Sequence, residues 1–163
     1  MSNRWALNAS PLIVLGKIGQ LDLFNMLAEE VVVPNEVAEE IKAGPENDMA
    51  RLAIETGKFL IASPSKPIAE LIAWDMGAGE TSVISFALNN SGWVAILDDA
   101  AARKCASSFG ISVKGSLAIV ILAKKRKLIP SAKQLLREMQ SAGLHLDEKI
   151  IQQVLKETLG EDW

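Results

Sequence analysis

Past the middle of the chain stands the stretch Trp93-Val94-Ala95-Ile96-Leu97-Asp98-Asp99, an apolar run that ends on two acids. A short and continuous apolar run is typical of a strand that is buried on both faces of a parallel sheet. In open α/β sheets, ligands bind beyond the carboxyl ends of the strands. The stretch therefore predicts a buried parallel strand that carries two carboxylates to a ligand site.

Outward from this stretch, short apolar strand candidates alternate with helical patterns. The other strand candidates are 5–7, 31–33, 59–61 and 111–113. Helices are expected at 10–18, 21–27, 35–43, 49–55, 80–88, 100–108 and 116–127. We expect Ser10 to cap the first of these helices and Asn35 to cap the third. The alternation predicts an α/β fold with a parallel sheet of four to five strands, covered by helices on both faces.

Two more helices, at 131–140 and 147–159, follow the last strand and are expected to form an appendage over about 130–159. A length of 163 residues suits one domain, 1–163, with a core over about 5–127. One cysteine, Cys105, excludes an internal disulfide, and with no signal peptide it favours a reducing cytoplasm. The longest apolar stretch, Leu117 to Ala123, is too short to span a bilayer, so no membrane association is expected.

Glu80 is an acid that shares a helical face with apolar residues. Val83, Ile84 and Ala87 follow it at helical spacing. Charges rarely face a core unless they are paired or hold a metal. Glu80 is therefore a candidate metal ligand; the alternative is an acid favoured by the dipole of a helix N-terminus.

The two acids after the strand at 93–97 have two possible tasks. One carboxylate can face a metal while the other caps the next helix, and the sequence leaves open whether Asp98 or Asp99 does which. Glu40 borders the apolar stripe of an earlier helix, where a solvated surface charge is the alternative. Asn8 ends the first strand; its amide disfavours aspartyl-phosphate chemistry but supplies an oxygen to Mg²⁺, unless it is only a turn residue.

The only histidine, His145, lies in the turn-like segment Gly143-Leu144-His145, and we interpret it as a surface residue. The formal charge of −3 means that nucleic-acid binding would rest on a local basic patch. Arg103, Lys104 and Lys114 are the candidates for phosphate contacts near the acids, with ordinary surface charge as the alternative.

In chain order, these motifs resemble the PIN domain, and within it the branch of VapC-type toxins. The motifs are Asn8-Ala9-Ser10-Pro11-Leu12-Ile13, Val33-Pro34 with Glu40-Ile41, Gly79-Glu80, Leu97-Asp98-Asp99 with Ala102-Arg103, and Gly115-Ser116. The resemblance implies a three-layer α/β/α sandwich with a helical C-terminal appendage. It also implies a pocket of three or four acids around one or two Mg²⁺ or Mn²⁺ ions.

Carried over to this chain, the catalytic and metal-binding acids of that pocket are Glu40, Glu80 and Asp98 or Asp99, with neutral oxygens of Ser10 and Ser116 assisting. The chain departs from the family pattern at Asn8, where the family normally has an aspartate. The departure removes one negative charge from the implied metal site.

The resemblance implies an endoribonuclease of the toxin–antitoxin type, which hydrolyses RNA phosphodiester bonds, is neutralised by an antitoxin protein and forms a homodimer. Because of Asn8, the alternative is a PIN-fold module that binds RNA or protein with impaired catalysis. A third interpretation is a nucleotide- or phosphosugar-binding α/β enzyme without nuclease activity.

Overall fold

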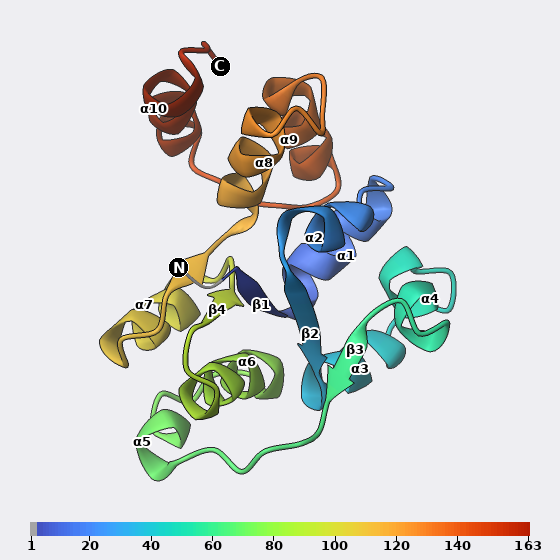
Figure 1. Ribbon diagram of the computed structural model, residues 1–163, viewed down its shortest axis with the longest axis vertical. Coiled ribbons are helices and arrows are strands. Elements are labelled where there is room, and N and C mark those ends of the chain that lie inside the picture. The colour runs from blue at the N-terminus through green and yellow to red at the C-terminus, as the bar shows by residue number, and fades with distance from the viewer. Residues whose placement is uncertain (1–2) are drawn as a thin grey trace.

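The computed structural model describes residues 3–163 and contains one five-stranded sheet (Figure 1). The strands are β1 (Arg4–Leu7), β2 (Glu30–Pro34), β3 (Leu60–Ala62), β4 (Trp93–Ile96) and β5 (Val113–Lys114). They lie in the order β3-β2-β1-β4-β5, and every pairing is parallel. The α/β fold with a parallel sheet that the sequence predicted is therefore confirmed.

Helices connect the strands throughout. They are α1 (Ala9–Lys17), α2 (Asp22–Leu27), α3 (Asn35–Lys42), α4 (Met49–Glu55), α5 (Ala69–Ile72), α6 (Ala78–Asn89), α7 (Ala100–Ser108), α8 (Ser116–Lys125), α9 (Ala132–Ser141) and α10 (Glu148–Leu159). Every helix expected from the sequence is present, and α5 is an addition. No helix within residues 3–163 is long and apolar enough to cross a membrane.

Two predicted helix caps are wrong. Asn8, and not Ser10, occupies the N-cap position of α1, and the Asn8 side chain makes no capping hydrogen bond. Pro34 precedes α3, and Asn35 is already its first residue. The extended backbone of Pro34 and Asn8 lets each helix begin directly at the end of a strand. The amide of Asn8 is consequently left to face the end of the sheet.

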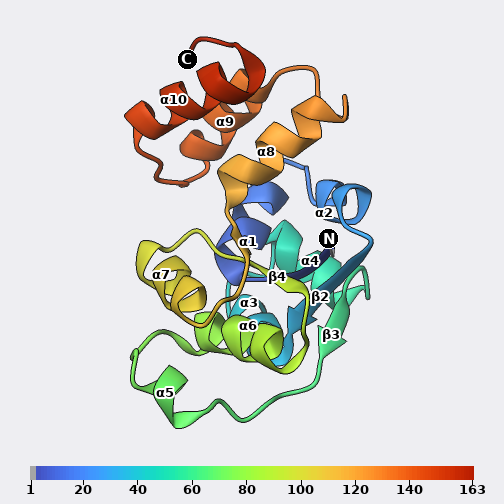
Figure 2. The same cartoon turned by 60° about the vertical axis from the view of Figure 1, so that its left-hand side comes forward.

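The direction of the chain across the sheet reverses once. From β1 it moves outward to β2 and β3, and then returns across the sheet to β4 and β5. Right-handed crossovers place α1–α4 on one face and α5–α7 on the other. Within each layer, α1 packs against α3 and α4, and α6 packs against α5 and α7, while α3 and α6 also pack against each other (Figure 2). β1 and β4, which meet where the direction reverses, end side by side, and the backbone nitrogen of Asn8 donates to the backbone carbonyl of Ile96 at 3.2 Å.

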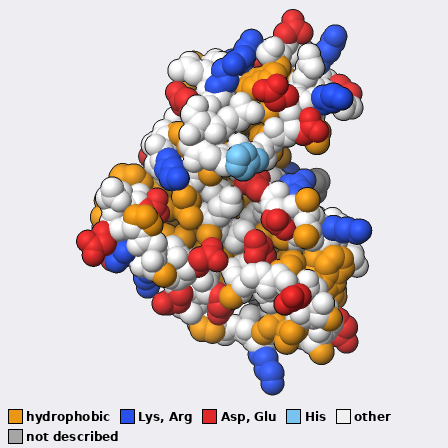
Figure 3. Space-filling view, turned by 180° about the vertical axis from the view of Figure 1, so that it is seen from behind, with side chains coloured by type: hydrophobic (Ala, Val, Ile, Leu, Met, Phe, Trp, Pro, Cys, Tyr) orange, Lys and Arg blue, Asp and Glu red, His pale blue; other side chains and the backbone are white. Residues whose placement is uncertain are grey.

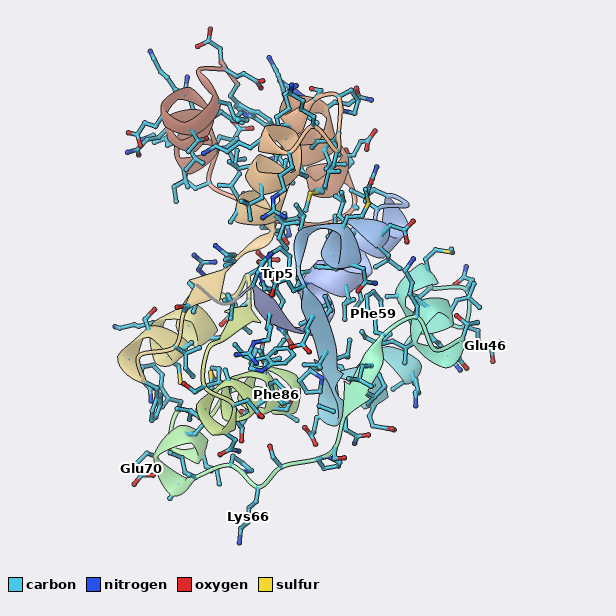
Figure 4. All side chains as sticks on the ribbon, viewed as in Figure 1. Trp5, Glu46, Phe59, Lys66, Glu70 and Phe86 are labelled. Carbon is cyan, nitrogen blue, oxygen red and sulfur yellow. The ribbon has the colours of Figure 1, made fainter. Side chains whose placement is uncertain are left out.

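The sheet interior and the C-terminal helices share one hydrophobic core. Trp5 is fully buried on the central strand β1, and Phe86 on α6 packs edge-on against Trp93 with ring centroids 5.0 Å apart. Figure 4 shows Trp5 inside the molecule and Lys66 pointing outward. In the C-terminal part, α8 packs against α2, α9 and α10, and the apolar faces of α9 and α10 are buried. This packing fixes the connection between α9 and α10 relative to the sheet.

Candidate functional site

Asp98 leaves the carboxyl end of β4 and is held by the start of α8. Its Oδ1 accepts a hydrogen bond from the Ser116 amide at 2.7 Å, and its Oδ2 accepts one from the Ser116 hydroxyl at 2.5 Å. Ser116 is fully buried. A side chain at Gly115 would lie 3.0 Å from Asp98 Oδ1 and 2.5 Å from Arg103 Nη1, so the glycine permits this close approach. Hydrogen bonds to a carboxylate are stronger than neutral ones, so Asp98 has a fixed position.

Asp99, the neighbouring acid, has a different task. Its Oδ2 accepts a hydrogen bond from the Ala102 amide at 2.9 Å and so caps α7. The capping carboxylate satisfies a helix amide that would otherwise lack a partner. The two acids thus divide as the sequence allowed, with Asp99 toward the helix amides and Asp98 toward the strand ends.

A second group of oxygens converges over Gly79, near the start of α6. A methyl group on Gly79 would lie 3.3 Å from Asn8 Oδ1 and 3.4 Å from Glu40 Oε1. Asn8 is buried at the end of β1, and Glu40 reaches this point from α3, which packs against α6. The glycine therefore leaves room for oxygens from two other elements to meet beside the helix that carries Glu80.

The acids of α3 and α6 influence each other electrostatically. Although the Glu40 side chain is largely exposed, partial burial raises the pKa of its carboxyl group above the usual 4.5, and the nearby charge of Glu80 raises it further. Burial and a like charge both disfavour the ionised form. A bound cation would offset the cost of ionising Glu40 beside Glu80. Carboxylates that repel each other in the absence of metal are typical of a metal site.

A cavity of about 470 Å³, which we call the acidic cleft, opens at this end of the sheet. It is lined by Asn8, Ser10, Glu80, Asp98, Asp99, Ala100, Gly143, Leu144 and His145. Glu40 lies beside Asn8 at Gly79, and Ser116 lies against Asp98. The strand ends and α6 thus bring together residues that are distant in the sequence.

The connection between α9 and α10 supplies the other wall of the acidic cleft. Gly143, Leu144 and His145 belong to it, and Figure 3 shows the pale blue histidine at a hollow with red acidic side chains gathered below it. His145 is exposed, as its turn-like surroundings predicted, but its place beside the acids was not foreseen. No local pattern signals it, because the position depends on how α9 and α10 pack against α8.

The three basic candidates differ in whether they line a cavity near the acids. Arg103 donates from Nη1 to the Leu97 carbonyl at 3.1 Å and lines a second cavity that adjoins the acidic cleft. Lys104 is exposed and Lys114 is half-buried, and neither lines the two cavities. Of the three, Arg103 is therefore the one that the fold places next to the acids.

The oxygen donors fit a hard divalent cation that keeps part of its water shell. Within residues 3–163, no three carboxylate, imidazole or thiol groups are close enough to surround one metal ion. The acids form smaller groups instead: Glu40 with Glu80, and Asp98 apart from them, with Asn8 adjoining both. Mg²⁺ typically takes one or two protein carboxylates and retains several waters. Ligation by these particular side chains stays a prediction.

The fold and the site define an α/β protein whose parallel sheet carries acidic side chains at the carboxyl ends of its strands. A family model described as a PIN domain, DUF3368, matches residues 4–160. The chain therefore belongs to the PIN domain family, as its ordered motifs indicated, and it has the nuclease-like fold of that family. PIN domains generally depend on a divalent metal ion. No curated protein and no solved structure is significantly similar to the chain.

Proposed function

We propose that the protein is a Mg²⁺- or Mn²⁺-dependent endoribonuclease that resembles the toxin of a toxin–antitoxin pair. The observation that carries this proposal is the convergence of Asn8, Glu80 and Asp98 on one cleft, with Glu40 beside Asn8. The cleft lies at the carboxyl ends of β1 and β4, where open α/β sheets bind their ligands. Family membership and the acidic oxygens support the same chemistry.

Each side chain of the cleft has a distinct task in this proposal. Glu40 with Glu80, or Asp98, would supply one or two carboxylates to the divalent cation, Asn8 would contribute a neutral oxygen, and water would complete the coordination shell. When bound, the cation supplies an activated water and neutralises charge on the phosphate. Ser116 keeps Asp98 in place through two hydrogen bonds, and the Ser10 hydroxyl lines the cleft where it can donate to a phosphate oxygen.

Asn8 supports a second candidate function, a PIN-fold module that binds RNA or protein with impaired catalysis. The amide occupies the position at the end of β1 where the resemblance places an aspartate. The Asn8 amide supplies no negative charge to the site. Among residues 3–163, no three acidic, imidazole or thiol groups lie close enough to share one metal ion. Weaker metal binding follows, since carboxylates are stronger ligands of Mg²⁺ than neutral amides.

Cleavage of labelled RNA separates the two candidates. Single-stranded and structured RNAs are incubated with the wild type, Glu80→Gln and Asn8→Asp, each with Mg²⁺ or Mn²⁺. Cleavage by the wild type that is lost in Glu80→Gln supports the ribonuclease. Cleavage only by Asn8→Asp supports the impaired module, and equal cleavage by wild type and Glu80→Gln contradicts the proposed site.

The partners and the compartment are part of the same proposal. An antitoxin and a second copy of the chain are the expected protein partners, and the buried, unpaired Cys105 agrees with a reducing cytoplasm. Exposed apolar side chains on α4 and the edge strand β3 support a protein contact; they are Met49, Leu52, Leu60 and Ile61. Light scattering of the purified chain measures whether it is a dimer, and a monomeric mass would contradict the homodimer.

A further inference from the structure

A second cavity, which we call the side pocket, adjoins the acidic cleft. Its volume is about 380 Å³, and its lining residues come from the segment after β4, α7, the start of α8, the connection between α9 and α10, and α10 itself. Asp98, Ala100 and His145 line both cavities. A ligand bound at the acids can therefore extend past His145 into the side pocket.

The side pocket has a larger apolar lining than the acidic cleft. Leu117, Leu146 and Ile150 form its apolar lining. Ile150 is 52% exposed, so α10 presents a large hydrophobic side chain to this cavity that the protein core does not cover. A concave apolar surface with a few polar groups is typical of a site for a small organic group.

The polar residues of the side pocket suit a flat heteroaromatic ring. His145 contributes an exposed imidazole at the boundary with the acidic cleft. Arg103 contributes a guanidinium group, which has five N–H donors and uses one of them on the Leu97 carbonyl. Asp147 is engaged, because its Oδ1 accepts from the Lys149 amide at 2.8 Å and caps α10. Unpaired bases of RNA stack on histidine rings and on arginine guanidinium planes.

We propose that the side pocket binds an unpaired nucleobase of the RNA strand whose phosphate lies in the acidic cleft. The inference rests on the proposed function, since it takes RNA as the ligand of the cleft. Asp98 forms the wall common to both cavities, so the base belongs to a nucleotide at or next to the phosphodiester bond that is cleaved. A paired base remains stacked inside its helix, so the substrate class is single-stranded RNA or an unpaired loop.

The imidazole protons of His145 give a direct test, because the chain contains no other histidine. In protein without a histidine tag, their NMR signals are followed during titration with adenosine or uridine 5′-monophosphate, which contain no phosphodiester bond for a ribonuclease to cleave. Ribose 5-phosphate is the control, because it has the same sugar and phosphate without a base. We expect saturable upfield shifts with the nucleotides from the ring current of the base, and little change with ribose 5-phosphate. No shift with either nucleotide, or equal shifts with ribose 5-phosphate, would overturn the base pocket.

A matched pair of variants tests the pocket on longer RNA. Ile150→Asp places a charge in the side pocket, whereas Met26→Asp makes the same kind of change on α2, at a side chain that is also 52% exposed. Both are made in a Glu80→Gln background so that the RNA stays intact during the measurement. Loss of one stacked base predicts about 5- to 150-fold weaker binding of fluorescent single-stranded RNA by Ile150→Asp, and unchanged binding by Met26→Asp.

Thermal unfolding verifies that both variants are folded, and equal RNA affinities of the two folded variants would overturn the inference. The two proposals fail separately. Nucleotide-dependent shifts of His145 without any RNA cleavage retain the pocket and reject the ribonuclease. Metal-dependent cleavage without such shifts retains the ribonuclease and rejects the pocket.

Discussion

Replacing Gly79 with alanine should weaken metal binding without lowering the stability of the fold. Gly79 is the second residue of α6, and a methyl group there would lie 3.3 Å from Asn8 Oδ1 and 3.4 Å from Glu40 Oε1. Both contacts are with the ends of side chains, and Glu40 is exposed, so its carboxylate can move aside. Alanine is favoured over glycine inside a helix by about 1 kcal/mol. The free energy of unfolding should therefore stay unchanged or rise by up to about 1 kcal/mol.

The same methyl group should damage the metal site. It enters the space over which the oxygens of Asn8 and Glu40 converge, and it forces at least one of them away. Changes to residues that orient metal ligands typically lower metal affinity by about 10- to 100-fold. Calorimetric titration with Mn²⁺ measures this loss, and thermal unfolding in EDTA measures the stability. For a chain of this size, 1 kcal/mol corresponds to about 2–4 °C in Tm.

Gly16→Ala is the matched control, because it should have the opposite pair of effects. A methyl group on Gly16, within α1, would lie 3.1 Å from the Ala50 backbone nitrogen, and the backbone of α4 cannot move aside as a side chain does. Overpacking costs about 1–3 kcal/mol, which outweighs or cancels the gain in helix propensity. We expect lower stability than in Gly79→Ala, with wild-type Mn²⁺ affinity. Wild-type Mn²⁺ affinity in Gly79→Ala would refute the assignment of Asn8 and Glu40 to one metal site.

Three further predictions concern the anchoring of the acids. Ser116→Ala removes the hydroxyl donor to Asp98, and the loss of a hydrogen bond to a charged group should cost about 1.5–3 kcal/mol in urea unfolding. Asp99→Ala removes the cap of α7 and should cost about 0.5–2 kcal/mol, with Mn²⁺ affinity in calorimetry unchanged. Glu80→Gln should lower the raised pKa of Glu40 in a carboxyl ¹³C NMR titration, because it removes a nearby negative charge. A raised pKa in the folded state means that stability increases as the pH falls through it, and this increase should be smaller in Glu80→Gln.

Each of these predictions has a control or an outcome that contradicts it. Ser82→Ala removes a buried hydroxyl that donates to the neutral Gly79 carbonyl at 2.7 Å, so it should cost less than Ser116→Ala. Equal costs would show that the bond to Asp98 has no special strength. Weakened Mn²⁺ binding in Asp99→Ala would show that Asp99 binds the metal as well as Asp98. An unchanged pKa of Glu40 in Glu80→Gln would show that the charge of Glu80 does not act on Glu40.

Local patterns in the sequence were sufficient for the sheet and for the strand ends. The apolar run of β4 followed by two acids predicted both a buried parallel strand and carboxylates at its carboxyl end, and the structure has both. Such features depend on residues that are adjacent or a few positions apart, where the period of the apolar side chains identifies the element. The same is true of Glu80, whose apolar neighbours on α6 marked a buried helical face.

The remaining features depend on contacts between segments that are far apart in the chain. The division of labour between Asp98 and Asp99 is fixed by the start of α8, which donates to only one of them. The place of His145 is fixed by the packing of α9 and α10 against α8, and the role of Gly79 by side chains from β1 and α3. Ser10 looked like a helix cap because serine is favoured there, yet α1 begins directly after β1 and takes Asn8 at that position.

A crystal of the protein soaked in Mn²⁺, with anomalous diffraction data, tests the central claim most directly. The claim is that the carboxyl ends of β1 and β4 and the acids of α3 and α6 form one cation site. We predict an anomalous peak in the acidic cleft, bound by oxygen atoms of Glu40, Glu80 or Asp98 with Asn8 beside it. A soaked crystal without a peak in the cleft, or with Mn²⁺ bound only elsewhere on the surface, would contradict the account.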